Sequence, residues 1–316
     1  MQKDLVVLVD TNNTLYRMYH TQPPREKGGV RVESAIGVIN EIRQLSKGTL
    51  LGVPKQVIAM FDANGKNFRH ELSPIYKQER KGMDPELKVQ ESLAKDALTA
   101  LGISVIEKEG VEADDSMGMV AHYFLNKGYD VLIVTIDKDM TQLIEDGITI
   151  YNPITKKLID REAVIAKFGV PPEKMAEYLA LMGDSNDGIP GVPSIGIKTA
   201  AKLLNEKGSI SAIIDGAQDV KGVVGENLRA FVGNLDLNLK LTTIVKDPLE
   251  LTDDELFIIN EPKVDPVQCK QMASKYGFNM DLIVGKPLIT APVVQKESKT
   301  KKAIVEDSGP SQGSLF

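Results

Sequence analysis

The sequence lacks the residues and segments that several large classes of protein require. It has a single cysteine, Cys269, among its 316 residues, so no disulfide can form within the chain. It has neither a Cys-x-x-Cys pair nor the paired histidines that bind zinc. No apolar stretch approaches the length of a membrane span, and the run in MQKDLVVLVD is too short for a signal peptide. We therefore expect a cytoplasmic protein, from a bacterial cell or a phage-infected host, with no membrane partner.

An excess of basic residues is also missing. The chain has 38 Lys and Arg against 44 Asp and Glu, and its formal net charge is −6. Taken alone, this charge argues against a nucleic-acid partner. The conclusion changes if nine of the 44 acids bind metal ions, because 35 acids then face the 38 basic residues. The remaining surface would be slightly basic.

Short β-branched runs alternate with amphipathic segments in the first half of the chain. Buried strands are predicted at 5–10, 56–62, 103–109 and 131–137. Helices are predicted near 33–47, 86–101 and 113–127. This alternation predicts an α/β fold, with a mostly parallel central sheet flanked by helices on both faces. The carboxyl ends of such strands are where α/β folds place their sites.

The pattern changes after about residue 160, where helical segments are separated by Gly and Pro. We expect an α/β core over 1–169 and a mainly helical subdomain over 170–290. Residues 291–316 have no sustained apolar face, so a flexible tail is predicted there.

Acids stand at the ends of the predicted strands and at the starts of helices. The stretch GVEADDSMG places three of them within four positions, and two further pairs occur in TIDKDM and MGDSNDG. A strand end directs residues two apart to the same side, and one helical turn brings residues three apart together. The full set is Asp10, Asp62, Glu112, Asp114, Asp115, Asp137, Asp139, Asp184 and Asp187.

Carboxylates without His or Cys are ligands for hard cations such as Mg²⁺ or Mn²⁺. Two such cations roughly 4 Å apart form the arrangement that hydrolyses phosphodiesters. Any one of these acids, taken alone, is more simply explained as a helix N-cap or a solvated charge. Their joint occurrence at strand ends and helix starts supports a metal site.

The chain resembles the 5′-nuclease family, which includes flap endonucleases, phage 5′→3′ exonucleases and the N-terminal nuclease domain of bacterial DNA polymerase I. The matching stretches are VDTNNTLYRMYH, FDANGKNFRHELSPIYKQERKGM, GVEADD, TIDKDMTQLI and MGDSNDGIPGVPSIGIKTAAKLL. They occur in the family's order between about residues 5 and 285. No polymerase domain follows in this sequence, so we expect a free-standing nuclease.

The resemblance implies a PIN-like nuclease core followed by a helix-three-turn-helix DNA-binding subdomain. It implies that all nine acids serve two Mg²⁺ (or Mn²⁺) ions. One metal region would be formed mainly by Asp10, Asp62, Glu112, Asp114 and Asp115, and the other mainly by Asp137, Asp139, Asp184 and Asp187. The sequence departs from the family at Ile136, where Gly is common, and at Gly188, where Asn is common. Neither departure removes a ligand.

The resemblance also implies which residues contact DNA. A helical arch of about 64–100 would gate the 5′ strand, with Arg69 and Lys77 contacting the scissile phosphate and Arg80 and Lys81 binding DNA nearby. The simpler explanation of this basic stretch is a solvated charge run. Tyr16 resembles the aromatic residue on which the terminal base stacks; a core tyrosine is the alternative.

The stretch GVPSIGIKTA predicts a turn followed by a helix beginning near Lys198. The resemblance makes it the helix-three-turn-helix that grips duplex DNA, with a K⁺ ion, through Gly191, Gly196, Lys198 and Thr199. An ordinary Gly/Pro loop is the alternative. The terminal QGSLF resembles a peptide that binds bacterial sliding clamps, with Gln312, Leu315 and Phe316 as its contacts.

We therefore expect a monomeric, Mg²⁺-dependent 5′→3′ exonuclease and flap endonuclease that acts on DNA with 5′ ends, flaps or nicks. Its products would be a 5′-phosphate and a 3′-hydroxyl, in replication primer removal and repair. The mutation Asp115→Asn is expected to keep substrate binding and to lose nearly all cleavage. Two alternatives stay open: a non-catalytic protein that binds DNA structures, and a ribonuclease that acts on RNA primers.

Overall fold

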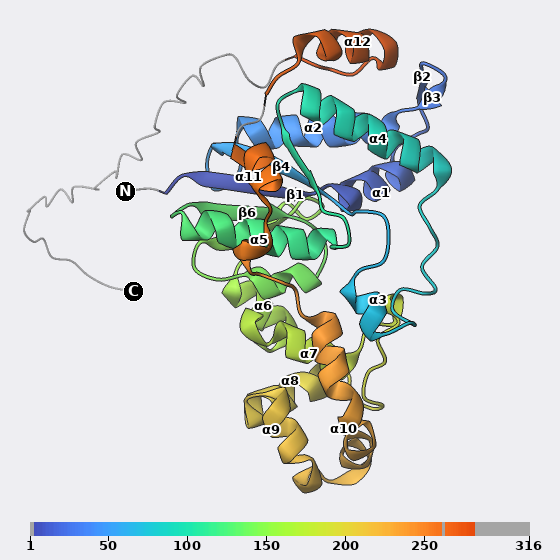
Figure 1. The fold of residues 1–316 in the computed structure, drawn as a ribbon. Helices are drawn as coiled ribbons and strands as arrows, with labels where there is room; N and C mark the ends of the chain where they lie inside the picture. Colours follow the sequence, from blue (N-terminus) through green and yellow to red (C-terminus); the bar gives the residue numbers. More distant parts are fainter. Residues whose placement is uncertain (1–2, 261–262, 282–316) are drawn as a thin grey trace, which may run out of the picture. The chain divides into compact units, whose positions relative to one another are not determined.

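Val- and Ile-rich segments form the central sheet of the computed structural model, which describes residues 3–260 and 263–281 (Figure 1). The strands of this sheet are β1 (Leu5–Asp10), β4 (Gln56–Phe61), β5 (Ser104–Glu107), β6 (Asp130–Val134), β7 (Ile148–Asn152) and β8 (Lys157–Ile159). Within the described residues their order is β5-β4-β1-β6-β7-β8, and only the β7–β8 pair is antiparallel. The predicted mostly parallel sheet is thus confirmed. The strands β7 and β8 were not anticipated.

Helices cover both faces of the sheet, as the alternation of strands and helices predicts. The helices of the first half are α1 (Thr11–Thr21), α2 (Glu33–Lys47), α3 (Phe68–Leu72), α4 (Pro85–Ala100), α5 (Ala113–Asn126) and α6 (Arg161–Phe168). Val7 and Val9 of β1 join the apolar cluster of α2 and α4, whereas Val6 and Leu8 join that of α5. Successive side chains of a strand point to opposite faces. Figure 1 accordingly shows α2 and α4 on one side of the sheet and α5 on the other.

The second half of the described chain is helical. Its α-helices are α7 (Met175–Met182), α8 (Ile197–Lys207), α9 (Ile210–Asp215), α10 (Gly222–Thr242), α11 (Asp253–Asn260) and α12 (Pro266–Tyr276). Short 3₁₀ turns occur in both halves: η1 (Asp139–Leu143), η2 (Pro172–Lys174), η3 (Ser185–Asp187), η4 (Ala217–Asp219) and η5 (Pro248–Glu250). In the first half, β2 (Glu26–Lys27) also pairs with β3 (Val30–Arg31). No helix among the described residues is long and apolar enough to cross a membrane.

One apolar cluster joins the sheet to these later helices. It runs from Val6 and Ile133 through Leu179 of α7 to Leu204 of α8 and Leu235 of α10. All the described residues belong to one compact unit, Met1–Val284. The boundary expected at residue 169 therefore marks a change of architecture within a continuous core, and as a domain division it stays a prediction.

The expected arch region, 64–100, divides into two parts with different packing. Helix α4 begins at Pro85 behind the N-cap Asp84, and Leu87, Ala94 and Leu98 are buried. These side chains belong to the cluster that covers the sheet beside α2, so α4 is part of the core layer. In the preceding segment 64–84, Tyr76 belongs instead to a small separate cluster with Ile189 and Leu241.

Two glycines allow the backbone to cross itself beside η3. A Cβ on Gly183, which has a φ of 71°, would lie 2.2 Å from the backbone N of Gly191. A Cβ on Gly191 would lie 1.9 Å from the carbonyl oxygen of Met182. No side chain fits at either position, so the turn between them is held tightly against the end of α7.

Candidate active site

A cavity of about 450 Å³ at the carboxyl ends of the central strands is lined largely by carboxylates. Eight of the nine acids expected to bind metal line it: Asp10, Asp62, Glu112, Asp114, Asp137, Asp139, Asp184 and Asp187. The ninth, Asp115, is fully buried and lies outside this lining. The structure therefore brings together acids that are up to 177 positions apart in the sequence.

The register of the sheet explains how the first acids meet. Asp10 is the last residue of β1 and lies opposite Met60 of β4. Asp62 directly follows β4, and Asp137 comes soon after the end of β6, the other neighbour of β1. Because these strands are parallel, their carboxyl ends lie at one edge of the sheet. Asp10, Asp62 and Asp137 consequently face one space.

Backbone and hydroxyl donors hold these carboxylates in place. Asp10 accepts hydrogen bonds from the hydroxyl of Thr135 at 2.7 Å and from the backbone N of Asn13 at 3.1 Å, as the N-cap of α1. Asp62 accepts one from the backbone N of Ala113 at 2.9 Å, at the first turn of α5. Each bond fixes one carboxylate before any ligand arrives.

The crowding of acids leaves an electrostatic strain in the metal-free protein. Burial, with repulsion from neighbouring carboxylates, raises the pKa of Asp10 to about 7 and that of Asp139 to about 7. The same two causes raise the pKa of Asp114 well above its ordinary value. A carboxylate whose charged form is disfavoured in this way is stabilised by a nearby cation.

The donor set fits a hard divalent cation. Oxygen atoms dominate the cavity, and neither His nor Cys lines it. Oδ1 of Asp139 is buried without a hydrogen-bond partner, so one ligand atom is available. Among residues 3–260 and 263–281, no three acid, His or Cys side chains converge to enclose an ion by themselves. Mg²⁺ does not require such an enclosure, because it keeps several waters and is bound through one or two carboxylates plus substrate phosphate.

Basic side chains already engage the acids of the cavity. Nζ of Lys77 lies 2.7 Å from Oε1 of Glu112, and Nζ of Lys138 lies 2.7 Å from Oδ2 of Asp184. Arg80 forms an ion pair with Asp187. Burial alone would raise the pKa of Glu112, but Lys77 and a second cation, Arg69, bring that pKa below its ordinary value.

The segment that carries Lys77 is fastened onto the η3 turn. Lys77 has a φ of 52°, a left-handed conformation, and its backbone N donates to the carbonyl oxygen of Asp187 at 2.9 Å. The hydroxyl of buried Tyr76 donates to Glu112 at 3.0 Å. The basic residues therefore lie directly over the acids.

Arg69 and Asp115, expected at the phosphate and at a metal ion, form a buried pair with each other. Arg69 is 3% exposed, and its Nη1 and Nη2 bind the two carboxylate oxygens of Asp115 at 2.5 and 2.9 Å. It also donates to the carbonyl oxygens of Leu241 and Thr243, while Asp115 accepts from the backbone N of Val245. Apart from a longer contact of 3.4 Å between Arg69 and Glu112, the pair is thus held by protein groups outside the cavity. Its geometry is that of a structural link between α3, α5 and the end of α10.

The remaining residues expected to contact DNA are exposed to different degrees. Tyr16 lines the acidic cavity and is 38% exposed, so its ring is accessible at the start of α1. Lys81 is exposed and is not part of the cavity lining. Both side chains are therefore accessible to a ligand.

The Gly/Pro-rich turn before α8 lies outside the acidic cavity. Gly196 is the N-cap of α8, and a Cβ there would meet no heavy atom within 4 Å. Lys198 is exposed and Thr199 is half-buried in the first turn of this helix. Gly191 differs from these, because the backbone crossing described above already requires a glycine there.

The two departures from the family pattern are compatible with the site. Ile136 is 40% exposed and lines the cavity between the strand end and Asp137. Gly188 has a φ of 69°, and a Cβ there would lie 2.5 Å from the carbonyl oxygen of Ile75. Asn tolerates that φ but would require Ile75 to move.

Sequence reasoning missed five polar residues around the acids. They are Asn12, Asn13, Thr135, Lys138 and Asn186. Most of them lie close in the sequence to an expected ligand: Asn13 follows Asp10 closely, and Lys138 lies between two expected ligands. Polar residues that flank candidate ligands are therefore candidates for orienting them.

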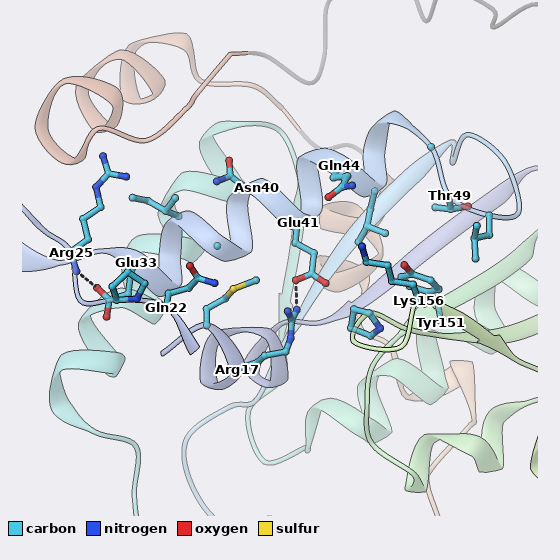
Figure 2. Close-up of a pocket in the computed structure, with 18 of the residues that line it drawn as sticks. Arg17, Gln22, Arg25, Glu33, Asn40, Glu41, Gln44, Thr49, Tyr151 and Lys156 are labelled. Atoms are coloured by element: carbon cyan, nitrogen blue, oxygen red, sulfur yellow. Dashed lines mark hydrogen bonds and ion pairs between the residues drawn. The ribbon is translucent and has the colours of Figure 1, made fainter. Parts of the chain in front are cut away.

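A larger cavity, of about 1000 Å³, is lined by residues of α1, of α2 and of the turn between β7 and β8 (Figure 2). Tyr16 faces the acidic cavity, whereas its neighbour Arg17 lines this second one. Both acids that line it accept hydrogen bonds, Glu41 from the side chain of Arg17 and Glu33 from the backbone N of Arg25. The larger cavity thus has no free carboxylates for metal binding.

The residues expected to bind a sliding clamp, Gln312, Leu315 and Phe316, lie outside the described part of the chain. The same holds for the expected tail, 291–316.

Comparison with known proteins gives two family matches that meet within the chain. A model described as 5′-3′ exonuclease, N-terminal resolvase-like domain, matches residues 5–169. A model described as 5′-3′ exonuclease, C-terminal SAM fold, matches residues 170–264.

Curated relatives include free exonucleases and much longer polymerases. The chain is 33% identical over 253 residues to the 5′-3′ exonuclease of Aquifex aeolicus, covering 79% of this chain and 86% of that one. It is 35% identical over 268 residues to DNA polymerase I of Mycobacterium leprae, covering 80% of this chain but 28% of the polymerase. The chain therefore spans less than a third of that polymerase.

Solved structures show the same fold at low identity. The flap endonuclease of bacteriophage T5, in a pseudo-enzyme-product complex with DNA and metal ions, has a TM-score of 0.63 at 23% identity, covering 85% of this chain and 98% of that one. The catalytic core of Rad2 in complex with DNA substrate has a TM-score of 0.54 at 16% identity, covering 91% of this chain and 93% of that one.

Proposed function

The chain belongs to the 5′-3′ exonuclease family, and on that premise we propose that it is a structure-specific 5′→3′ exonuclease and flap endonuclease. It hydrolyses DNA at 5′ ends, nicks and flap junctions, and leaves a 5′-phosphate and a 3′-hydroxyl. The observation that carries this proposal is the cavity at the strand ends, lined by eight carboxylates and closed by Lys77 and Arg80. Such an activity serves primer removal in replication and repair.

The carboxylates are the residues that would hold two Mg²⁺ or Mn²⁺ ions. Asp10, Asp62 and Asp114 form one region with Glu112, and the loop after β6 forms the other with the η3 turn. When bound, such a pair of ions activates water and stabilises the attacking and leaving oxygens of a displacement at phosphorus. Asp115 acts indirectly, because through Arg69 it fixes the start of α5, from which Glu112 and Asp114 project.

The basic and aromatic residues at the mouth of the cavity handle the substrate. Lys77 and Arg80, released from Glu112 and Asp187, stabilise the charge that develops on the scissile phosphate. Permanent cations suit this role in a site rich in carboxylates. Tyr16 stacks on an unpaired base, a contact that accepts any base.

Duplex DNA binds at the turn before α8, through the exposed start of that helix at Gly196, Lys198 and Thr199. Backbone N–H groups at a helix N-terminus favour phosphate, and contacts to phosphate fix position without reading sequence. A K⁺ ion at this turn, and a clamp contact through Gln312, Leu315 and Phe316, belong to the same proposal. Calorimetry of a peptide of residues 305–316 with a sliding clamp tests the latter; no binding would remove it.

Cleavage of a labelled 5′-flap DNA in Mg²⁺ tests the proposal. The wild-type chain should release the flap, whereas Asp114→Asn should bind the same DNA and leave it intact. The matched control is Asp160→Asn, since Asp160 caps α6 far from the cavity and Asn caps equally well.

Two outcomes would replace the proposal with an alternative. Binding of flap DNA without cleavage in Mg²⁺ or Mn²⁺ would indicate a non-catalytic DNA-binding protein. Faster cleavage of a flap that has a ribonucleotide 5′ segment would indicate a ribonuclease that acts on primers.

A further inference from the structure

The second acid region is assembled from two elements that are separate in the fold. Asp137 and Asp139 follow β6, whereas Asp184 begins the η3 turn behind α7. Asp184 accepts a hydrogen bond from the backbone N of Asn186 within its own turn. Its other oxygen accepts a hydrogen bond from Nζ of Lys138 at 2.7 Å. Among the described residues, this is the one side-chain hydrogen bond between segments 135–139 and 184–188.

Lys138 is placed so that one ammonium group serves both elements. The backbone around it is fixed, because the N of Asp137 donates to the hydroxyl of Thr135 and the N of Asp139 donates to the carboxylate of Asp137. Nζ of Lys138 also lies 3.9 Å from Oδ1 of Asp139, the buried atom that has no hydrogen-bond partner. The ammonium therefore separates two carboxylates that would otherwise repel each other.

We propose that Lys138 is a positioning residue of the cavity, an internal counter-ion that holds Asp139 and Asp184 together until a divalent cation takes its place. The inference rests on the proposed function, which makes these acids cation ligands. The Lys138 side chain is 43% exposed, so it can turn toward solvent on its flexible four-carbon stem when a cation enters. Lys77 and Arg80 engage other acids, and neither contacts Asp184 or Asp139.

Removal of this ammonium has two opposite effects. The η3 turn loses its side-chain link to the β6 loop, and the carboxylates lose a positive charge that competes with a divalent cation. At about 4 Å and an effective dielectric constant of about 20, charge repulsion outweighs the loss of one half-exposed hydrogen bond. A lysine that only supported the fold would show weaker cation binding when removed. A lysine that only contacted DNA would show no change without DNA.

The experiment measures Mn²⁺ binding to the full chain without DNA, from the electron paramagnetic resonance signal of free Mn²⁺. We expect Lys138→Met and Lys138→Gln to bind Mn²⁺ about tenfold more tightly than wild type, and Lys138→Arg to stay within about twofold. The control is Lys55→Met, because Lys55 makes an ion pair of similar length, 2.8 Å with Asp4, at the opposite end of the sheet.

Hydrogen exchange supplies a second readout in the same variants. Without Mn²⁺, amides of residues 184–189 should exchange faster in Lys138→Met than in wild type, and Mn²⁺ should restore their protection. Unchanged or weaker Mn²⁺ affinity in both neutral variants overturns the inference, as does tighter binding by Lys138→Arg. Failure of the wild-type chain to bind Mn²⁺ would instead overturn the proposed function, so the two failures are distinguishable.

Discussion

The buried pair Arg69–Asp115 gives the sharpest test of the structure, because the substitution Asp115→Asn distinguishes a structural ion-pair partner from a metal ligand. Asp115 is fully buried and Arg69 is 3% exposed, and two hydrogen bonds join them. In Asp115→Asn the amide can still accept from the backbone N of Val245, but it cannot neutralise the guanidinium. Arg69 would then keep only its longer contact with Glu112, at 3.4 Å, as compensation for its buried charge.

The magnitude follows from this geometry. Removal of one partner of a buried ion pair costs about 3–5 kcal/mol, because the other charge stays desolvated. The pair lies entirely within protein, so solvent does not screen it. We expect Asp115→Asn and Arg69→Met each to lower the free energy of unfolding by about 3–5 kcal/mol. The double variant has no unpaired charge, so its loss should be close to that of one single variant, with a coupling energy of about 3 kcal/mol.

The assay is urea unfolding of the metal-free protein in EDTA, followed by circular dichroism at 25 °C, for the four members of the cycle. Asp114→Asn is the matched control, since it changes an adjacent acid that lines the cavity and has a raised pKa. That control should be as stable as wild type or more stable. If Asp115→Asn unfolds at the wild-type urea concentration, or if the two losses add, the structural role is refuted and Asp115 returns to the set of metal ligands.

Three further predictions concern the cavity and its rim. Lys77→Met should lower the rate of single-turnover flap cleavage by about 10²–10³-fold, as the loss of a transition-state donor does. Its affinity for flap DNA should stay close to wild type. A change in rate below threefold would exclude Lys77 from the chemistry. Gly188→Ala should destabilise the chain by about 1–3 kcal/mol in urea unfolding, because of its φ of 69° and the contact with Ile75; an unchanged midpoint would contradict that contact. Burial raises the pKa of Asp10 to about 7, so protonation of Asp10 favours the folded state. The metal-free protein should therefore lose stability as the pH rises from about 4 to about 7. In a thermal-melting series over this pH range, Asp10→Asn should show a smaller decline in stability, and an equal decline in the variant would refute the assignment to Asp10.

The sequence predicted the parts of the fold that depend on short-range pattern. Runs of β-branched residues predicted β1, β4, β5 and β6 close to their observed bounds, because parallel strands buried on both faces contain continuous apolar residues. The strands β7 and β8 were missed, since the burial of ITIYN and KLI is incomplete and KLI has only three residues. Acids at strand ends predicted the cavity for a simple reason: the sheet places those ends together.

The pairing of Arg69 with Asp115 could not be read from the sequence. Asp115 is adjacent to Asp114, and only the rotation of α5 decides that one faces the cavity and the other faces the core. The partners that saturate Arg69 lie about 170 positions away, at the end of α10. Such pairings depend on tertiary packing, for which local spacing contains no signal. Lys138 was overlooked for a local reason: the two acids beside it were interpreted as metal ligands, and the lysine between them was not considered.

The apolar cluster that runs from the sheet into α7, α8 and α10 has a consequence for how the chain can be divided. A fragment of residues 1–169 would contain the complete sheet, yet it would expose the side chains that Leu179 and Ile244 now cover. The buried amide of Gln142 would also lose its two backbone partners, Thr242 and Ile244. Such a fragment would aggregate or stay partly folded, although it spans a whole family segment. The two halves should thus melt in a single transition, and the acids at the strand ends can form a site only once the helices behind them have folded.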